Sequence, residues 1–295
     1  MSTKTTTVSR TRHTLSVPNL TGRFFLYFST IVLSILFLFP FAWTVSSSLK
    51  TAVEVEAYPP SFIPHVLQWA NYYEAWTSIS FAIFFKNSLI VTGLSLIGAT
   101  ASSFVVAYGF ARFRFPYRNG LFALCLATMI LPPEVTIIPL FIVFKQIGWL
   151  DTLKPLIVPS FFGGGAFNIF LLRQFLTTLP FELDEAAMID GASRFDILLR
   201  VILPNSKPAL AAVAVFTFIF QWNDFFAPLI FLNTPKNFTI PLGLYNLKSY
   251  VGDPGEPKDQ LLMAGSVIAT LPVILLFFSA QRYFVQGIVT SGLKG

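Results

Sequence analysis

Six long apolar runs alternate with shorter polar segments along the chain. They cover about residues 24–45, 84–109, 120–143, 156–177, 207–231 and 261–284. A helix needs about 20 residues, at 1.5 Å each, to cross roughly 30 Å of hydrocarbon, and every run reaches that length. The pattern predicts an all-α integral membrane protein with six transmembrane helices. We divide it into a polar tail over 1–23, a six-span domain over 24–285 and a C-terminal tail over 286–295.

Helix-breaking residues interrupt several of these runs. Pro132-Pro133, Gly163-Gly164-Gly165 and Pro272 all lie inside them. Because lipid cannot hydrogen-bond to freed backbone groups, we expect these helices to pack against neighbours that do. The first run is about 22 residues long and has no convincing cleavage site, so we interpret it as a retained anchor rather than a signal peptide.

Composition supports the membrane class. The chain is 54% hydrophobic and 12% charged, against about 25% charged in soluble domains. A single cysteine, Cys125, excludes an intrachain disulfide and a cysteine-cluster metal site. The two histidines, His13 and His65, are far apart in the sequence, so we expect no metal site.

Basic residues predict the orientation. With the N-terminus in the cytoplasm, the cytoplasmic segments hold thirteen of the 20 Lys and Arg residues, including every arginine, and the outer segments hold seven. The positive-inside rule therefore places both termini, and the segment over about 180–205, in the cytoplasm. The outer segments are too short to form a ligand-binding domain, so a separate protein would have to capture a substrate outside.

The segment between the fourth and fifth runs predicts two short helices. Asp190-Gly191 should weaken the first helix, since glycine costs about 1 kcal/mol relative to alanine. Ser193 and Asp196 have the spacing of a capping box that would start the second helix, and Pro204 should end it. A stripe at helical spacing joins the two, and its small member Gly191 would permit close approach of a partner. The stripe consists of Ala187, Gly191, Phe195, Leu198 and Ile202.

The charge of this segment favours docking onto a protein. Helices that lie on a bilayer usually have a polar face rich in Lys and Arg. Here acidic residues outnumber Arg194 and Arg200; the acidic residues are Glu182, Asp184, Glu185, Asp190 and Asp196. Anionic lipid would repel them, so we favour a docking surface over a membrane-lying helix.

The sequence holds no machinery for catalysis or nucleotide binding. Gly252–Asp259 is the nearest match to a phosphate-binding loop, but it lacks the second glycine and the Ser/Thr and contains prolines. No Ser/His/Asp or Cys/His arrangement suggests nucleophilic catalysis. We therefore expect a non-enzymatic protein that takes its energy from a partner.

Polar residues within the runs are candidates for a substrate pathway. Ser88, Thr92, Ser95 and Ser102 share one face of the second run, which fits close helix packing and pore lining equally well. Asn87 is a further polar candidate. Glu134 lies near the middle of the third run, where a carboxylate costs several kcal/mol unless paired or hydrated. It is a functional candidate, although a structural hydrogen bond is the alternative.

The fifth run carries Gln221-Trp222-Asn223-Asp224, in which Asn223 would lie about 24 Å along the helix from Lys207. A ring beside amide and carboxylate groups suits sugar binding. The alternatives are a structural contact between helices or an interface anchor.

One pattern carries a family resemblance. Glu185-Ala186-Ala187, Gly191, Val201 and Leu203-Pro204 together resemble the signature loop of ABC-importer permease subunits, with Val201 where the family more often has Ile. The chain from about Asn71 to its end resembles the second permease subunit of the maltose-type, sugar-importing branch. Other matching segments are Asp151-Thr152-Leu153, residues 171–175, residues 221–224 and residues 292–295.

The resemblance implies a permease subunit in the inner membrane of a prokaryote. Its partners would be a companion permease, two cytoplasmic ATPase subunits that hold ATP and Mg, and an external solute-binding protein. This chain would bind no cofactor and no nucleic acid. ATPase docking would involve Glu185, Ala186, Ala187, Asp190, Gly191, Phe195, Leu198 and Pro204. The tail residues Ser291, Gly292, Leu293, Lys294 and Gly295 would also contact the ATPases.

Two alternatives to a sugar permease stay open. A glycerol-phosphate importer would favour a basic residue at a span centre, and none is found, so a neutral sugar is preferred. A self-sufficient secondary transporter predicts paired intramembrane charges or inverted repeats. The chain offers only Glu134 and Asp224 as acidic candidates and shows no repeat. The sequence does not indicate which sugar is carried.

Overall fold

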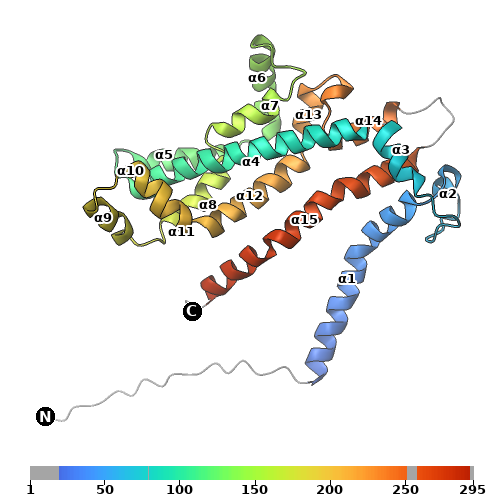
Figure 1. The fold of residues 1–295 in the computed structure, drawn as a ribbon, viewed down its shortest axis with the longest axis horizontal. Coiled ribbons are helices and arrows are strands. Elements are labelled where there is room, and N and C mark those ends of the chain that lie inside the picture. Colours follow the sequence, from blue (N-terminus) through green and yellow to red (C-terminus); the bar gives the residue numbers. More distant parts are fainter. Residues whose placement is uncertain (1–19, 79, 251–257, 293–295) are drawn as a thin grey trace.

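The computed structural model describes residues 20–78, 80–250 and 258–292, and every regular element within them is helical (Figure 1). The longest helices are α1 (Leu20–Ser48), α4 (Phe81–Arg112), α6 (Pro133–Gln146), α12 (Lys207–Trp222) and α15 (Asp259–Gly292). Helices of intermediate length are α3 (Ala70–Ser78), α5 (Arg118–Ala127), α8 (Ala166–Leu176), α9 (Glu182–Ile189) and α14 (Ile240–Tyr250). The shortest are α2 (Ala52–Glu56), α7 (Lys154–Ile157), α10 (Arg194–Asp196), α11 (Leu203–Asn205) and α13 (Phe226–Phe231). The predicted all-helical class is confirmed.

Within these residues, four segments are long and apolar enough to cross a membrane. They are Gly22–Ser48, Phe81–Arg112, Lys154–Leu176 and Asp259–Gln281. Two bent pairs raise the number to six if each pair is one span. One pair joins Arg118–Ile130 to Glu134–Gln146 at 97°, and the other joins Arg194–Asn205 to Lys207–Trp222 at 79°. The six apolar runs in the sequence therefore agree with the upper count of candidate spans, but the third run is a broken helix.

The fifth run is not one helix, contrary to the sequence-based expectation. Helix α12 ends at Trp222, and the chain turns before α13 begins at Phe226. Asp224 accepts a hydrogen bond from the Ala227 N–H at 3.3 Å. Asn and Asp compete with helix backbone in this way, because their side chains bond to nearby N–H groups. Asn223 and Asp224 thus lie in a break rather than on a helix face.

Helix α4 is the centre of the bundle, and its hydroxyl-bearing face packs against other segments. Ser88, Thr92 and Ser95 are buried. The Ser88 hydroxyl accepts a hydrogen bond from the Ile240 N–H at 2.8 Å, and the Ser95 hydroxyl donates to the Leu156 carbonyl at 3.1 Å. Of the two interpretations left open for this face, helix packing is the one that the contacts support.

The glycine run approaches α4 so closely that no side chain fits. A Cβ atom on Gly164 would lie 2.2 Å from the Ala99 carbonyl oxygen, and its φ of +64° favours glycine. Irregular backbone at membrane depth requires partners from the protein. Here the Asn168 amide supplies one by donating to the Gly164 carbonyl at 2.8 Å.

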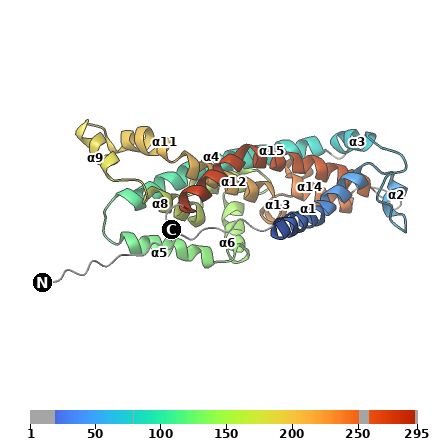
Figure 2. The same ribbon diagram turned by 90° about the horizontal axis from the view of Figure 1, so that it is seen from below.

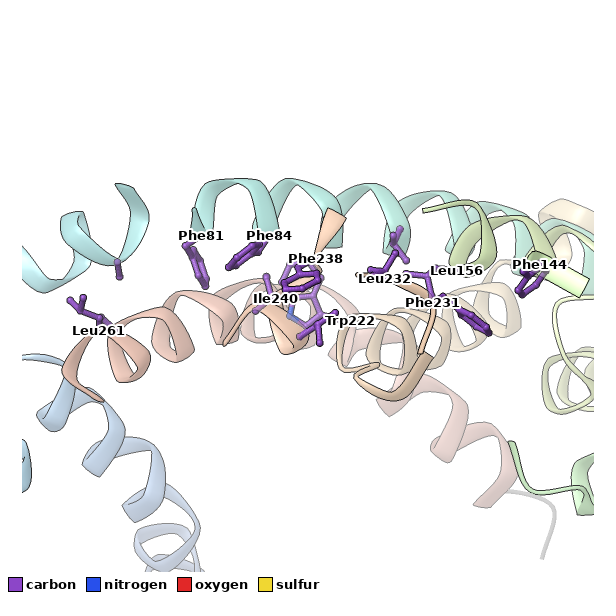
Figure 3. Close-up of a cluster of buried hydrophobic side chains, with 14 residues drawn as sticks. Phe81, Phe84, Phe144, Leu156, Trp222, Phe231, Leu232, Phe238, Ile240 and Leu261 are labelled. Carbon is purple, nitrogen blue, oxygen red and sulfur yellow. The ribbon is translucent and has the colours of Figure 1, made fainter. Parts of the chain in front are cut away.

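Two apolar clusters flank the middle of α4. The first surrounds the Phe81 end of α4 and includes Phe84, Phe238, Ile240 and Trp222, which Figure 3 shows between α4 and α15. The second surrounds the Arg112 end and includes Phe104, Leu172, Ile197, Ile202 and Val213. Close packing is the main attraction between helices in lipid, where apolar burial gives little driving force. These clusters therefore fix the position of α4.

Helix α1 stands apart from the bundle in Figure 1, and its apolar window has no buried residue. Its Ser48 end is held by Asn71, whose amide donates to the Ser48 and Lys50 carbonyls at 2.9 and 2.8 Å. Tyr72 adds a hydroxyl contact to Ser48 at 2.7 Å. From residue 22 to about residue 42, almost all side chains of α1 are exposed.

The last helix is longer than predicted. Helix α15 continues beyond residue 285 to Gly292, so residues 286–292 of the predicted C-terminal tail are helical. No proline follows Pro272 in the sequence to interrupt the helix. Gln286, Val289 and Thr290 have no strong preference against a helical conformation. Ser291 and Gly292 lie in the last turn, whereas Leu293, Lys294 and Gly295 lie outside the described residues.

A half-buried hydrogen-bond network joins the turn after α6 to the segment after α13. Asp151, at φ +57°, accepts hydrogen bonds from the Asn233 and Thr234 N–H groups, both at 2.9 Å. The Thr234 hydroxyl and the Asn237 amide also donate to it, at 2.7 and 3.1 Å. Burial alone would raise the pKa of Asp151, but these donors outweigh burial and lower the pKa well below its ordinary value.

We expect Asp151→Asn to lower the free energy of unfolding by about 2 kcal/mol, because an amide accepts these hydrogen bonds less strongly than a carboxylate. Since the folded-state pKa is depressed, the ionised carboxylate contributes stability above its unfolded pKa of about 4 and loses it as pH falls further. Thermal unfolding in detergent should show a constant advantage of the wild type from pH 8 to about pH 5, which shrinks below about pH 4. An advantage that disappears near neutral pH would contradict this account.

Candidate docking loop and cavity

Helix α9 ends in a two-hydrogen-bond motif that requires a left-handed residue. The Ala192 N–H donates to the Ala187 carbonyl at 2.9 Å, and the Gly191 N–H donates to the Met188 carbonyl at 3.1 Å. Gly191 has φ +81°. This is the Schellman arrangement, in which glycine at the position after the cap satisfies otherwise free carbonyls. The helix break predicted at Gly191 is present, and its cause is backbone conformation.

The predicted capping box at the second short helix is confirmed. The Ser193 hydroxyl accepts from the Asp196 N–H at 3.2 Å, and the Asp196 carboxylate accepts from the Ser193 N–H at 3.3 Å. Beyond it the chain forms a π-helical turn over Ile197–Ile202 and then α11. The motif fixes the angle at which the chain leaves α9.

The outward surface of this loop, Glu182 to Pro204, combines apolar and acidic side chains. Ile189 is 86% exposed and Phe195 is 65% exposed. Other exposed candidates from the sequence are Glu185, Ala186, Asp190, Gly191 and Pro204, and Ala187 is half-buried. Large exposed apolar side chains rimmed by charge mark an interaction surface.

One candidate for docking faces the wrong way. Leu198 is 5% exposed and packs in the second apolar cluster with Ile197 and Ile202. The predicted stripe assumed a regular α-helix, but the π-helical turn changes the angle at which successive side chains leave the axis. Leu198 and Ile202 therefore point inward, while Phe195 points outward.

A buried ion pair attaches the loop to α4. The Arg112 Nε lies 3.5 Å from the Asp184 Oδ2, and the two side chains are 1% and 3% exposed. The Arg112 guanidinium also lies 4.5 Å from the centre of the Phe181 ring. Among the described residues neither charged group has a hydrogen-bond partner. Charge attraction and the aromatic contact therefore offset only part of the cost of burial.

The second short helix is attached to the same end of α4. The Tyr108 hydroxyl donates to the Arg194 carbonyl at 3.5 Å, and the Arg194 guanidinium lies 5.8 Å from the Phe113 ring centre. Both halves of the loop thus contact one helix end. A displacement of the loop would act directly on α4.

A cavity of about 680 Å³ lies farther along α4. Its apolar wall includes Phe144, Phe167, Phe216, Phe220 and Phe231. Its polar lining includes Ser160, Asn168, Thr217, Gln221 and Asp224. Ala99 of α4 forms part of the wall, so one helix reaches both the loop and the cavity. Gln221 and Asp224 are the pathway candidates from the sequence that line it.

Two other pathway candidates have structural contacts. The Trp222 indole donates to the Ala269 carbonyl at 3.0 Å and its ring stacks on Phe218 at 5.4 Å. The Asn87 amide donates to the Lys236 and Phe238 carbonyls at 2.9 and 3.0 Å. Trp222 is therefore a core residue, and Asn87 satisfies backbone carbonyls in the connection between α13 and α14.

Asn223 and Glu134 lie outside the cavity lining. Asn223 is exposed, and its amide donates to the Ile219 carbonyl at 2.7 Å. Glu134 is exposed in the first turn of α6, after the break at Pro132. The positive end of a helix favours a carboxylate there. The expectation of a carboxylate deep within a continuous span is thus corrected by the bend.

Sequence reasoning did not assign roles to Arg112, Asp184 or Asn168. Arg112 ends a long apolar helix and Asp184 is one of several acids in a short one, so nothing local pairs them. The Asn168 amide donates to the Thr217 hydroxyl at 3.2 Å. Its position shortly after the glycine run was the one sequence feature that could have indicated a polar wall of the cavity. An amide beside interrupted helix usually satisfies backbone that lines a cavity.

Helices that can span a membrane, a projecting loop and an internal cavity together form the architecture of a transport component. Residues 103–290 match the family model of the binding-protein-dependent transport system inner membrane component. The chain belongs to this family, and it is an ABC-transporter permease rather than an enzyme.

Relatives and solved structures agree with this assignment. The chain is 34% identical over 269 residues to the arabinooligosaccharides transport system permease protein of Bacillus subtilis, covering 90% of this chain and 93% of the relative. It is 33% identical over 258 residues to the sn-glycerol-3-phosphate transport system permease protein of Agrobacterium fabrum, covering 85% and 90%. A chain of a bacterial ABC transporter involved in the import of the acidic polysaccharide alginate shares the fold, with a TM-score of 0.77 at 23% identity and coverage of 90% and 99%.

We expect Gly191→Ala to lower the stability of the loop by about 1 kcal/mol, and Gly191→Asn to lower it less, because asparagine tolerates the left-handed conformation better. A Cβ atom at Gly191 meets nothing within 4 Å, so size alone is no obstacle within the chain. Protection of α9 amides in hydrogen exchange measures this order. The opposite order, with the larger asparagine worse, would show that close approach of a partner decides the choice of glycine.

We expect Arg112→Leu and Asp184→Leu each to destabilise the protein by about 3–5 kcal/mol, because each leaves one buried charge without its partner. The double variant should recover most of that loss, since two apolar side chains leave no charge buried. Thermal unfolding of the four proteins in detergent completes the mutant cycle. Additive losses in the double variant would show that the two side chains do not interact.

Proposed function

We propose that this chain is one permease subunit of an ATP-driven importer of a neutral carbohydrate. Helix α4 carries this proposal, because it connects the loop around Arg112 to the wall of the cavity at Ala99. A rigid helix that joins a projecting loop to an internal cavity is suited to alternating access. When the loop moves, the helix moves with it, and the cavity changes the side of the membrane to which it opens.

The loop surface is the proposed site of ATPase docking. Ile189 and Phe195 supply apolar area, and Glu185 and Asp190 supply charge beside it. A projecting helix face of this kind fits a groove on a partner. Two ATPase subunits would carry ATP and Mg and supply the energy. The end of α15 and residues 291–295 would contact the same subunits.

This proposal implies an orientation in the membrane. The loop and the Arg112 end of α4 would lie in the cytoplasm, together with both chain termini, as the distribution of arginine favours. The opposite end, around Asp151 and α3, would face an external solute-binding protein. The outward-facing apolar surface of α1 would be covered by lipid and by a companion permease.

The cavity supports a neutral, hydroxyl-rich substrate. Phenylalanine rings offer apolar surface to the C–H face of a sugar, and Asn168, Gln221 and Asp224 offer hydrogen-bonding groups. Asp224 is the only titratable residue in the described lining, and that lining holds no Lys or Arg that could pair with an anion such as glycerol phosphate. The relatives named for arabinooligosaccharides and for sn-glycerol-3-phosphate represent the two substrate classes to be compared.

We expect Gln221→Leu to slow uptake of a neutral oligosaccharide about tenfold at low substrate concentration, as loss of one good hydrogen bond implies. Asn223→Leu is the matched control, since Asn223 lies two residues away outside the lining, and its uptake should be normal. Labelled substrate in proteoliposomes with the complete importer is the measurement. Preferential uptake of glycerol phosphate by the wild type would overturn the carbohydrate proposal.

A further inference from the structure

The turn between α4 and α5 borders a second cavity, of about 360 Å³, which is open to the surface. It is lined by Arg114, Phe115, Tyr117, Arg118, Asn119 and Gly120. The lining contains two arginines and no acidic residue. In the described part of the chain neither Arg114 nor Arg118 forms an ion pair. Their positive charge is therefore available to an anion.

The geometry of the turn gathers donors around this cavity. The Arg118 Nη1 donates to the Phe113 carbonyl at 3.1 Å, which holds the side chain beside the turn and leaves its other N–H groups for a ligand. Tyr117, at φ +60°, precedes α5 without a side-chain cap. The N–H groups of the first turn and the positive helix end thus add to the arginines. Arginine and backbone N–H donors together suit phosphate oxygens.

A third arginine reinforces the charge. Arg173 of α8 lies with its guanidinium 4.1 Å from the centre of the Phe122 ring of α5. Its Nε atom is buried and has no hydrogen-bond partner among the described residues. The contact places a positive charge beside the first half of α5, where no described acidic side chain forms an ion pair with it.

The surroundings of the cavity are apolar and exposed. Tyr117 is 86% exposed, and Leu121 and Leu124 on α5 are 47% and 64% exposed. Figure 2 shows α5 and the docking helix α9 on opposite sides of the molecule. The arginines therefore lie where an apolar helix surface meets a polar turn. A ligand with an anionic head and apolar chains matches this boundary.

We propose that Arg114, Arg118 and the first turn of α5 bind the phosphate of an anionic phospholipid of the cytoplasmic leaflet. This site goes beyond the transport function, although the choice of leaflet rests on the orientation proposed above. A soluble phosphate ester has the same head chemistry. The exposed apolar side chains of α5 favour the lipid, because only the lipid also has acyl chains to cover them.

Lipid binding to the full chain, purified in detergent, tests the site. Native mass spectrometry during titration with phosphatidylglycerol, with phosphatidylcholine as the neutral lipid, gives the affinities. We expect Arg114→Gln with Arg118→Gln to weaken phosphatidylglycerol binding about thirtyfold and to leave phosphatidylcholine unchanged. Arg23→Gln is the matched control, since it removes a positive charge predicted at the same membrane face without touching the cavity, and binding should stay at the wild-type level.

The remaining outcomes separate the alternatives. The charge-retaining variant Arg114→Lys with Arg118→Lys should bind within about fivefold of the wild type, and it decides the matter if the glutamine variant does not fold. Wild-type affinity in the glutamine variant, or equal loss in the lysine variant, would overturn the site. Displacement of the lipid by millimolar inorganic phosphate would overturn the lipid as ligand.

The leaflet is tested separately. In a Cys125→Ser chain, a cysteine introduced by Asn119→Cys should react with a membrane-impermeant thiol reagent only after cells are permeabilised. Labelling in intact cells would overturn the orientation and the leaflet, while the affinities measured in detergent would still report on the site itself.

Discussion

The buried contact between Arg112 and Asp184 is the constraint on which the rest of the structure depends. Two charges with side-chain exposures of 1% and 3% are expensive to remove from water, and each is tolerated because the other lies 3.5 Å away. The pair therefore prevents separation of α9 from the end of α4. Two further contacts hold the same pair of segments together. The Phe181 ring lies against the Arg112 guanidinium, and the Tyr108 hydroxyl, one turn earlier on α4, donates to the Arg194 carbonyl. These contacts attach the loop rigidly to the end of α4, although it would otherwise be held only by its connections to the two spans.

Helix α4 is suited to this role because it is unbroken for 32 residues while its neighbours are not. The glycine run lies against it at Gly164, and the chain also bends near Pro132 and breaks at Asn223-Asp224. Side chains close in the sequence satisfy some of the freed backbone groups, as Asn168 does for Gly164 and Asp224 for Ala227. The irregular segments border the cavity, where non-helical backbone at membrane depth is tolerated. In the proposed function, the continuous helix would transmit displacement, and the interrupted ones would allow the cavity to change shape.

Much of the architecture was predictable from the sequence, since length and apolarity specify helices that cross a membrane. The capping box at Ser193 was equally predictable, because a cap is a local interaction between residues three apart. What failed required knowledge of packing. Leu198 was expected on the surface because a π-helical turn leaves no signal in the spacing, and Trp222 was expected in a sugar site because its partner Ala269 is distant in the chain. Arg112 and Asp184 were missed for the same reason: 71 positions separate them, and only the fold brings them together.

The central claim is that α9 and α4 move as one body, and a distance measurement across the joint tests it most directly. In a Cys125→Ser chain within the assembled importer, spin labels at Ile189→Cys on α9 and Val105→Cys on α4 occupy exposed positions. Pulsed electron paramagnetic resonance gives the distribution of distances between them. The account predicts one narrow distribution that is unchanged when ATP is added, and a broad one after Asp184→Ala. A distance in the unsubstituted joint that shifts with nucleotide would show that α9 moves independently of α4, which contradicts the account.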